Sequence, residues 1–349
     1  MSETSRIHAE MTAGRRFDLP AKAPQPCAKY AGVIAAMVSP CSSPGVIDSL
    51  AAERLCGQLA KHGCNGVFIA SSTGEALLLD EQDRRLLTSA ARKALTPKTT
   101  IYAGVTGLGL KQTVRYAQNA AEDGADVAVV MAPFLFKISQ AELVDYFLRI
   151  ADASPIPIAL YHHHKMSTAI SVETVARVAE HENIVAIKDT NPDIERTAAL
   201  IEVTAGKDFS VFQGNEVLLL ESLTRGAKGM VTAIANFAPE SHADLYKTAI
   251  AGNITEAKRH QAQIVRLLEI LFFEPVLGSI SAFAACIKLA VKRRGWLDRT
   301  DVMLPGFVLD EGFQTMVQNH LAVLGVPTGT PIVEPIAKTL AADTRPQVA

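Results

Sequence analysis

The chain has 349 residues, of which 48% are hydrophobic and 20% charged, with a formal net charge of −2 and a pI near 6.5. This composition predicts a folded protein with a substantial core, and it gives no electrostatic case for binding nucleic acid or an anionic membrane. No apolar run reaches the roughly 18 residues that a membrane span needs, and the polar N-terminus lacks the hydrophobic block of a secretory signal. The five cysteines form no CxxC pair, which favours reduced thiols and a cytoplasmic location.

Four regions are expected along the chain. Residues 1–30 are rich in alanine and proline and predict a flexible N-terminal extension. Residues 31–250 alternate strands with helices, residues 251–325 predict three further helices, and the proline-rich residues 326–349 predict a tail. The middle one of the three further helices is strongly apolar on one side. We expect it to pack against the preceding region or to form part of a subunit contact.

The alternation in residues 31–250 predicts eight strand–helix pairs. Short, continuous apolar strands are typical of a parallel sheet that helices cover on the outside. Eight of them favour an α/β fold closed into a (β/α)8 TIM barrel with a C-terminal helical region, and the absence of a GxGxxG after the first strand counts against a dinucleotide fold. The expected strands are 32–38, 66–70, 100–104, 127–131, 156–161, 184–189, 209–213 and 229–232, and the expected helices are 48–62, 81–94, 110–123, 140–152, 171–180, 192–204, 215–224, 238–249, 253–273, 276–294 and 308–323.

Lys188 follows the apolar run Ile184–Ile187 and is the first candidate catalytic residue. Burying an ammonium group is costly and lowers its pKa, and the neutral amine is the form that attacks ketones to make a Schiff base. The alternative is a lysine that extends its charge into solvent from the strand end. This stretch alone would favour that alternative.

Other polar residues follow the strands at the end where such barrels carry their active sites. The hydroxyls and N–H groups of Ser72-Thr73-Gly74 suit a small carboxylate, although an ordinary turn that caps the next helix is the alternative. Tyr161 ends the fifth strand, where a phenol can move protons near Lys188 or can simply fill the barrel mouth. Glu75 is expected to be a structural hydrogen-bond anchor.

These motifs carry a resemblance to a known family. Ser72-Thr73-Gly74-Glu75, Tyr161, Ala186-Ile187-Lys188-Asp189 and Gln213-Gly214-Asn215 follow one another in its order and spacing. Over roughly residues 30–325 the chain resembles the dihydrodipicolinate synthase/N-acetylneuraminate lyase family of class I, pyruvate-dependent aldolases. The resemblance implies a (β/α)8 barrel, usually a homotetramer, that uses no metal or organic cofactor.

The same resemblance implies roles for individual residues. Lys188 would form the Schiff base, and Tyr161 would shuttle protons. Ser72, Thr73 and Gly74 would bind the pyruvate carboxylate. The site would also be lined, through backbone groups, by Gly214 and Thr232.

Two loops depart from the family pattern. Synthases of the family place an arginine shortly after the strand-five tyrosine, to bind the carboxylate of the second substrate. Here the loop is one residue shorter, so Lys165 or Met166 takes that position, and neither offers a guanidinium fork. After the fourth strand, Phe134-Leu135-Phe136 stands where relatives carry a tyrosine for the proton relay of a neighbouring subunit. The first departure weakens the case for the lysine-biosynthesis reaction, and the second indicates a relay that is broken or rerouted.

The run His162-His163-His164 leaves three interpretations open. The first is a hydrogen-bonding wall or substitute relay for a polyhydroxylated or acidic substrate, with His162, His164 and Lys165 as substrate-binding residues. The second is a metal site in which His162 or His164 joins Glu75. The third is a solvated loop with one histidine packed on the rim. Adjacent residues of an extended segment point to opposite sides, so at most two of the three histidines can converge.

The sequence therefore predicts a class I lyase. Lys188 would form an imine with pyruvate or another 2-keto acid, and a C–C bond to an aldehyde would be made or cleaved, giving a 2-keto-3-deoxy sugar acid or related 2-oxo acid. A dehydratase or hydratase-aldolase that uses the same imine, and a poorly catalytic keto-acid-binding relative, remain alternatives, as does a metal-dependent enzyme that rests on the histidines alone. The expected partners are these small molecules and further copies of the chain, as a tetramer or dimer.

Overall fold

The computed structural model describes residues 30–329 apart from 273–275, 277–278 and 305–307. Residues 1–29 of the expected extension and residues 330–349 of the expected tail lie outside the described residues. The division of the chain into four regions therefore stays a prediction.

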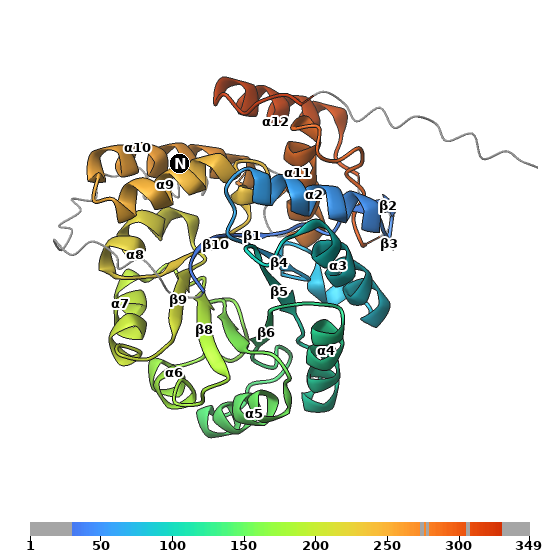
Figure 1. The fold of residues 1–349 in the computed structure, drawn as a ribbon. Coiled ribbons are helices and arrows are strands. Elements are labelled where there is room, and N and C mark those ends of the chain that lie inside the picture. Colours follow the sequence, from blue (N-terminus) through green and yellow to red (C-terminus); the bar gives the residue numbers. More distant parts are fainter. Residues whose placement is uncertain (1–29, 273–275, 277–278, 305–307, 330–349) are drawn as a thin grey trace, which may run out of the picture.

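Eight parallel strands close into a barrel in the order β1-β10-β9-β8-β7-β6-β5-β4 (Figure 1). The predicted (β/α)8 TIM barrel with a C-terminal helical region is confirmed. A short antiparallel hairpin after the first strand, β2 (Cys41–Ser43) and β3 (Val46–Ile47), was not predicted. The barrel strands are β1 (Gly32–Ala36), β4 (Gly66–Ile69), β5 (Thr100–Gly104), β6 (Val127–Met131), β7 (Ile158–His162), β8 (Ile184–Asp189), β9 (Ser210–Gln213) and β10 (Gly229–Thr232).

Helices surround the barrel, and local signals fix where several of them begin. Asp48 caps α2 by accepting a hydrogen bond from the backbone N–H of Ala51. At α3, Asp80 and Asp83 form a reciprocal capping box, which satisfies two N–H groups that a helix start would leave unpaired. The surrounding helices are α2 (Ser49–Lys61), α3 (Glu81–Ala94), α4 (Leu110–Glu122), α5 (Gln140–Ala153), α6 (Val172–Val178), α7 (Ile194–Val203), α8 (Leu219–Arg225) and α9 (Pro239–Ile250).

Alternation along the strands divides the core into two parts. Inward-facing side chains form a compact cluster that includes edge-on aromatic pairs, with ring centroids 6.2 Å apart for Tyr102 and Phe212 and 6.1 Å apart for Phe68 and Tyr161. Outward-facing residues join the larger cluster between the barrel and its helices. Side chains fill the barrel interior, and in such barrels the active site lies outside it, at the carboxyl ends of the strands.

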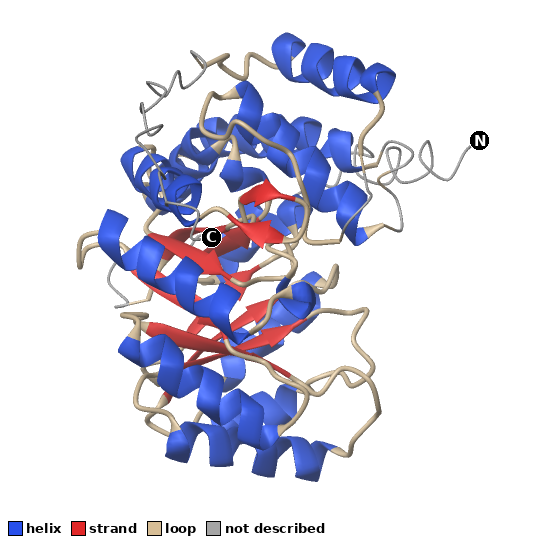
Figure 2. Ribbon diagram, turned by 90° about the vertical axis from the view of Figure 1, so that its right-hand side faces the viewer, coloured by secondary structure: helices blue, strands red, loops and turns tan. Residues whose placement is uncertain are grey.

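Three further helices, α10 (Ile254–Leu268), α11 (Ile280–Arg293) and α12 (Glu311–Val323), lie together on one side of the barrel (Figures 1 and 2). A hydrogen bond fastens α10 to the segment after β9, where Gln261 donates to the carbonyl of Glu216 at 2.8 Å. Most of α11 is buried, which agrees with the expectation that it packs on the rest of the chain. None of the helices in the described part of the chain is long and apolar enough to cross a membrane.

Candidate functional site

Lys188 lies near the carboxyl end of β8 and is only 8% exposed. Strand pairing places it beside Tyr161 on β7 and Phe212 on β9. Its Nζ lies 4.3 Å from the ring centroid of Tyr161 and 5.5 Å from that of Phe68. The amine is therefore surrounded by aromatic faces, which attract a cation without the full charge of a carboxylate.

The Tyr161 hydroxyl accepts a hydrogen bond from Ser72 Oγ at 3.3 Å, across the barrel mouth. Tyr161 is only 3% exposed, whereas Ser72 is exposed. Lys188, Tyr161 and Ser72 come from β8, β7 and the turn after β4, so the barrel brings together groups that are far apart in the sequence. A phenol and a hydroxyl thus lie in one chain of contacts beside an amine.

The turn that carries Ser72 and Thr73 is held in an unusual backbone shape. It is flanked by Ala70 at φ +50° and Glu75 at φ +59°, both in the left-handed region that residues other than glycine rarely adopt. Each such residue costs on the order of 1 kcal/mol or more and persists only where the surroundings enforce it. At Gly74 a Cβ would lie 2.7 Å from the carbonyl oxygen of Met37, so this position must be glycine for packing reasons.

A buried ion pair enforces the end of this turn. Glu75 Oε2 lies 2.9 Å from Lys288 Nζ on α11, and neither side chain is exposed to solvent. The other carboxylate oxygen of Glu75 accepts a hydrogen bond from the N–H of Met303 at 2.8 Å, and Lys288 also donates to the carbonyl of Asp301 at 2.7 Å. Glu75 is thus the structural anchor that the sequence predicts.

Gly214 packs directly against the lysine. A Cβ there would lie 2.9 Å from Lys188 Cε and 2.3 Å from Thr190 Oγ1. Any side chain at this position would push the lysine stem out of its place.

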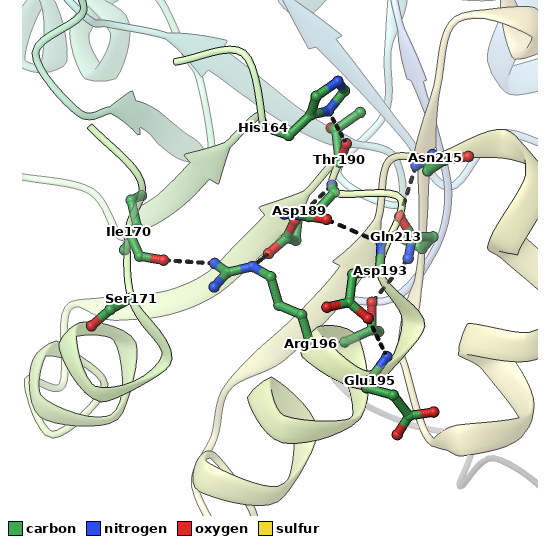
Figure 3. A network of polar contacts seen from close by, with 12 residues as sticks. His164, Ile170, Ser171, Asp189, Thr190, Asp193, Glu195, Arg196, Gln213 and Asn215 are labelled. Carbon is green, nitrogen blue, oxygen red and sulfur yellow. Dashed lines mark hydrogen bonds and ion pairs between the residues drawn. The ribbon is translucent and has the colours of Figure 1, made fainter. Parts of the chain in front are cut away.

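A network of hydrogen bonds holds Asp189 and Thr190, the residues that follow Lys188 (Figure 3). The buried carboxylate of Asp189 pairs with Arg196 Nε at 2.6 Å, and Arg196 also donates to the carbonyl of Ile170 at 2.7 Å. The carbonyl of Asp189 accepts from the N–H of Gly214 at 2.7 Å. The end of β8 is therefore fixed to α7 and to the loop after β9.

A cavity of about 740 Å³ opens above these groups. The predicted site residues that line it are Lys188, Tyr161, Ser72, Thr73, Gly214 and Lys165. Between the two residues that the sequence left open for the arginine position, Lys165 lines the cavity, whereas Met166 packs against the inward-facing cluster of the barrel. Gly74 and Thr232 do not line it, and the Thr232 hydroxyl is buried without a hydrogen-bond partner in the described structure.

The prediction for the histidine run needs correction, because His163 lines the cavity and His162 and His164 do not. Tyr161 faces the barrel interior, so alternation turns His162 to the helix side, where it is 2% exposed near Asp189. His164 is exposed on the loop. Its ring is hydrogen-bonded to the carbonyl of Thr190 and is stacked on the ring of His163, with the centroids 4.5 Å apart.

Burial and cationic neighbours, among them His164 and Lys188, lower the pKa of His163 to about 4. Its imidazole is therefore neutral at neutral pH. Burial likewise lowers the pKa of His162, partly offset by the carboxylate of Asp189. Neither ring adds positive charge to the cavity under these conditions.

The expected alternative of a metal site has no support from the histidines. Both carboxylate oxygens of Glu75 are already engaged by Lys288 and Met303. In the described residues there is no group of three His, Cys, Asp or Glu side chains placed to hold a metal ion.

Several cavity residues were not identified from the sequence. Side chains alternate along a strand, so an inward Tyr161 predicts an inward His163 two residues later. Thr190 comes directly after β8, where loops of such barrels build the site. The C-terminal helices contribute apolar side chains, among them Leu268, Ile280 and Phe283, and the sequence does not indicate that these residues line the cavity.

Comparisons with known proteins agree with this geometry. The family model described as "Dihydrodipicolinate synthetase family" matches residues 29–324. The chain is 29% identical over 246 residues to the 4-hydroxy-tetrahydrodipicolinate synthase of Methanothrix thermoacetophila, covering 70% of this chain and 83% of that protein. It is 31% identical over 281 residues to an uncharacterized DapA-like lyase of Pyrococcus furiosus, covering 80% of this chain and 92% of the relative.

Two similar solved structures contain pyruvate. YagE of E. coli K12, a prophage protein of the dihydrodipicolinic acid synthase family, has a TM-score of 0.80 at 26% identity, covering 86% of this chain and all of that chain. The dihydrodipicolinate synthase of Acinetobacter baumannii has a TM-score of 0.77 at 28% identity, covering 85% of this chain and 99% of that chain. Because the family model matches most of this chain, the chain belongs to the dihydrodipicolinate synthetase family, whose members are lyases of the class I aldolase type.

Proposed function

We propose that Lys188 forms a Schiff base with pyruvate or a closely related 2-keto acid, and that the enzyme then makes or cleaves a C–C bond next to it. One observation carries this proposal. A buried amine lies 4.3 Å from the ring of Tyr161, whose hydroxyl is hydrogen-bonded to Ser72, at the floor of a cavity. The two solved relatives that contain pyruvate support the choice of keto acid.

The residues have distinct roles in this mechanism. The amine of Lys188 attacks the keto carbon and water leaves, which gives the imine. Loss of a proton from C3 gives an enamine, and its C3 attacks the carbonyl carbon of an aldehyde while the aldehyde oxygen takes up a proton. Water then releases the 4-hydroxy-2-oxo acid from Lys188. Tyr161 transfers the protons, and the hydroxyls and N–H groups of Ser72 and Thr73 bind the carboxylate.

Borohydride reduction in the presence of pyruvate tests the proposal directly. Borohydride reduces an imine to a stable amine, so the intact mass should rise by one reduced pyruvate, on the peptide that contains Lys188. Lysine in place of the second-substrate arginine makes dihydrodipicolinate synthase activity the less favoured alternative. An adduct that forms without turnover of any aldehyde would favour the alternative that this chain binds a keto acid but catalyses poorly. Absence of any adduct with pyruvate or with a panel of 2-keto acids would contradict the imine.

Tyr161→Phe should lower kcat by roughly 10²- to 10⁴-fold, the usual contribution of a general acid–base group. The aromatic ring beside Lys188 remains, so the fold and the imine site should survive. Steady-state kinetics measures the loss, and borohydride trapping shows whether the adduct still forms. Unchanged kcat in this variant would remove Tyr161 from the proton transfers.

We also propose that the enzyme assembles as a homo-oligomer, with a tetramer or dimer as the candidates. Apolar side chains are exposed on the loops after β5 and β6, where Leu108 is 85%, Leu135 72% and Phe136 74% exposed. Exposed apolar groups of this kind mark interaction surfaces. Sedimentation velocity should show an oligomer that Leu135→Asp with Phe136→Asp shifts toward smaller species, while Val323→Asp, another exposed apolar position, does not. A wild-type monomer would contradict this assembly.

A cytoplasmic location also remains a proposal. The four described cysteines, Cys41, Cys56, Cys64 and Cys286, are all free and buried, which supports a reducing compartment.

A further inference from the structure

The C-terminal helices line part of the cavity. Leu268 comes from α10, Leu271 from the short helix after it (η4, Glu269–Leu271), and Ile280 and Phe283 from α11. We call these four residues the apolar wall. Leu268 and Phe283 are partly buried, and Ile280 is 48% exposed.

The apolar wall is fixed in place by contacts with the barrel side of the chain. Gln261 on α10 accepts a hydrogen bond from the N–H of Leu220 at 2.9 Å and donates to the carbonyl of Glu216 at 2.8 Å. The thiol of Cys286 on α11 contacts the carbonyl of Ile270, which lies beside Leu271, at 3.6 Å. These contacts join α10 to α8 and to the segment after β9, and they join α11 to η4, so the apolar wall is a built surface of the cavity.

Some polar atoms near the apolar wall are occupied by the protein itself. One oxygen of Glu216 accepts hydrogen bonds from the N–H groups of Ala233 and Ile234 at 2.8 and 3.0 Å, and its other oxygen is buried 3.6 Å from His242 Nε2, without a hydrogen-bond partner among the described residues. The side-chain oxygen of Asn215 accepts from the N–H of Val217 at 3.1 Å. A polyhydroxylated partner on this side of the cavity would exchange its hydrogen bonds with water for contacts with Leu, Ile and Phe side chains, which costs free energy.

The cavity is also larger than a three-carbon keto acid requires. About 740 Å³ falls within the range of roughly 300–1,000 Å³ that holds a drug-sized ligand. The groups suited to the keto acid, namely Lys188, Tyr161, Ser72 and Thr73, occupy one part of its lining. The second substrate therefore has room for a sizeable body against the apolar wall.

We infer that the second substrate is an aldehyde with an apolar body, aryl or alkyl, which packs against the apolar wall while its carbonyl carbon meets the enamine on Lys188. This inference rests on the proposed function, and it replaces the polyhydroxylated partner of a 2-keto-3-deoxy sugar acid, which the sequence predicts, with an apolar one. The reaction joins C3 of pyruvate to the aldehyde carbon, one proton goes to the aldehyde oxygen, and water releases the product from the lysine. The product is a 4-hydroxy-2-oxo acid with an apolar substituent on C4.

A matched series of aldehydes tests the inference on the full-length wild-type enzyme with pyruvate. Propanal and 3-phenylpropanal share the same kind of carbonyl, so the ratio of their kcat/KM values reports on the apolar body alone. D-Glyceraldehyde represents the polyhydroxylated class. We expect kcat/KM for 3-phenylpropanal to exceed that for propanal by roughly tenfold or more, as burial of a phenyl group predicts, and to exceed that for glyceraldehyde as well.

Variants of the apolar wall locate the effect. Ile280→Asn and Phe283→Gln should each reduce the ratio of 3-phenylpropanal to propanal by about threefold to tenfold. Because Ile280 is half exposed, its variant should fold even if the Phe283 variant does not. Val323→Asn, a polar replacement of a 79% exposed residue on α12, is the matched control and should leave the ratio unchanged.

Borohydride trapping with pyruvate, run in parallel, tests the Schiff base on Lys188 separately from the choice of aldehyde. An adduct on Lys188 together with equal or better use of glyceraldehyde would overturn the apolar partner and leave the imine intact. A wild-type preference for 3-phenylpropanal that the Ile280 variant does not reduce would overturn the role of the apolar wall. Absence of the adduct would overturn the proposed function and this inference with it.

Discussion

Lys188→Ala is expected to abolish turnover, with a loss of at least roughly 10⁴-fold in kcat, the scale seen when a covalent nucleophile is removed. The physical reason is that no other amine is described in the cavity lining apart from Lys165, which comes from the loop after β7. Borohydride should trap no pyruvate on the variant. Coupled kinetics and intact mass measure the two effects independently.

Two further lysine variants make this experiment specific. Lys188→Arg keeps a positive charge, but the guanidinium stays protonated and forms no imine, so it should be as inactive as the alanine variant. Lys292→Ala removes an exposed lysine of α11 and should retain both adduct and activity. Normal turnover by Lys188→Ala would refute the Schiff-base mechanism for this chain.

Lys288→Met is expected to destabilise the protein by about 3–5 kcal/mol, because it leaves the carboxylate of Glu75 buried without its charge partner. The KM for pyruvate should rise as well, since Glu75 ends the turn that carries Ser72 and Thr73. Urea unfolding at a fixed protein concentration measures the first effect, and initial rates measure the second.

A double-mutant cycle decides whether the loss of stability in Lys288→Met comes from the broken ion pair or from the changed volume of the side chain. Glu75→Gln with Lys288→Met removes both charges and should recover part of the lost stability. Arg259→Met breaks an exposed ion pair with Glu256 on α10 and should unfold close to the wild type. If Lys288→Met unfolds at the same urea concentration as Arg259→Met, the buried pair has no special role in this fold.

Much of the barrel could be predicted from the sequence because its signals are local. The helix expected at 81–94 matches the bounds of α3, Glu81–Ala94, since Asp80 and Asp83 mark its start. The strand that ends with Lys188 was visible as a short apolar run closed by a lysine, and β8 spans Ile184–Asp189. Periodicity and capping depend on neighbours within a few positions, so the chain itself records them.

The errors at the site come from side-chain direction and from long-range contacts. Because Tyr161 faces inward, strict alternation selects His163, whereas the sequence-based prediction names His162 and His164 as the substrate-binding histidines. Lys288 shows no sign in the sequence that it reaches Glu75, which lies 213 positions earlier. The apolar wall was equally hidden, because Leu268 and Phe283 resemble ordinary residues of a buried helix face.

Glu75 and Lys288 lie 213 positions apart, and this separation has a consequence during synthesis on the ribosome. Ser72 and Thr73 emerge early, yet the lysine that neutralises the carboxylate closing their turn emerges only after the eight barrel strands. Until then Glu75 has either to stay in water or to take up a proton, and Ala70 and Glu75 lack the packing that supports their left-handed backbone. The carboxylate-binding turn therefore matures late in translation, although it is encoded near the start.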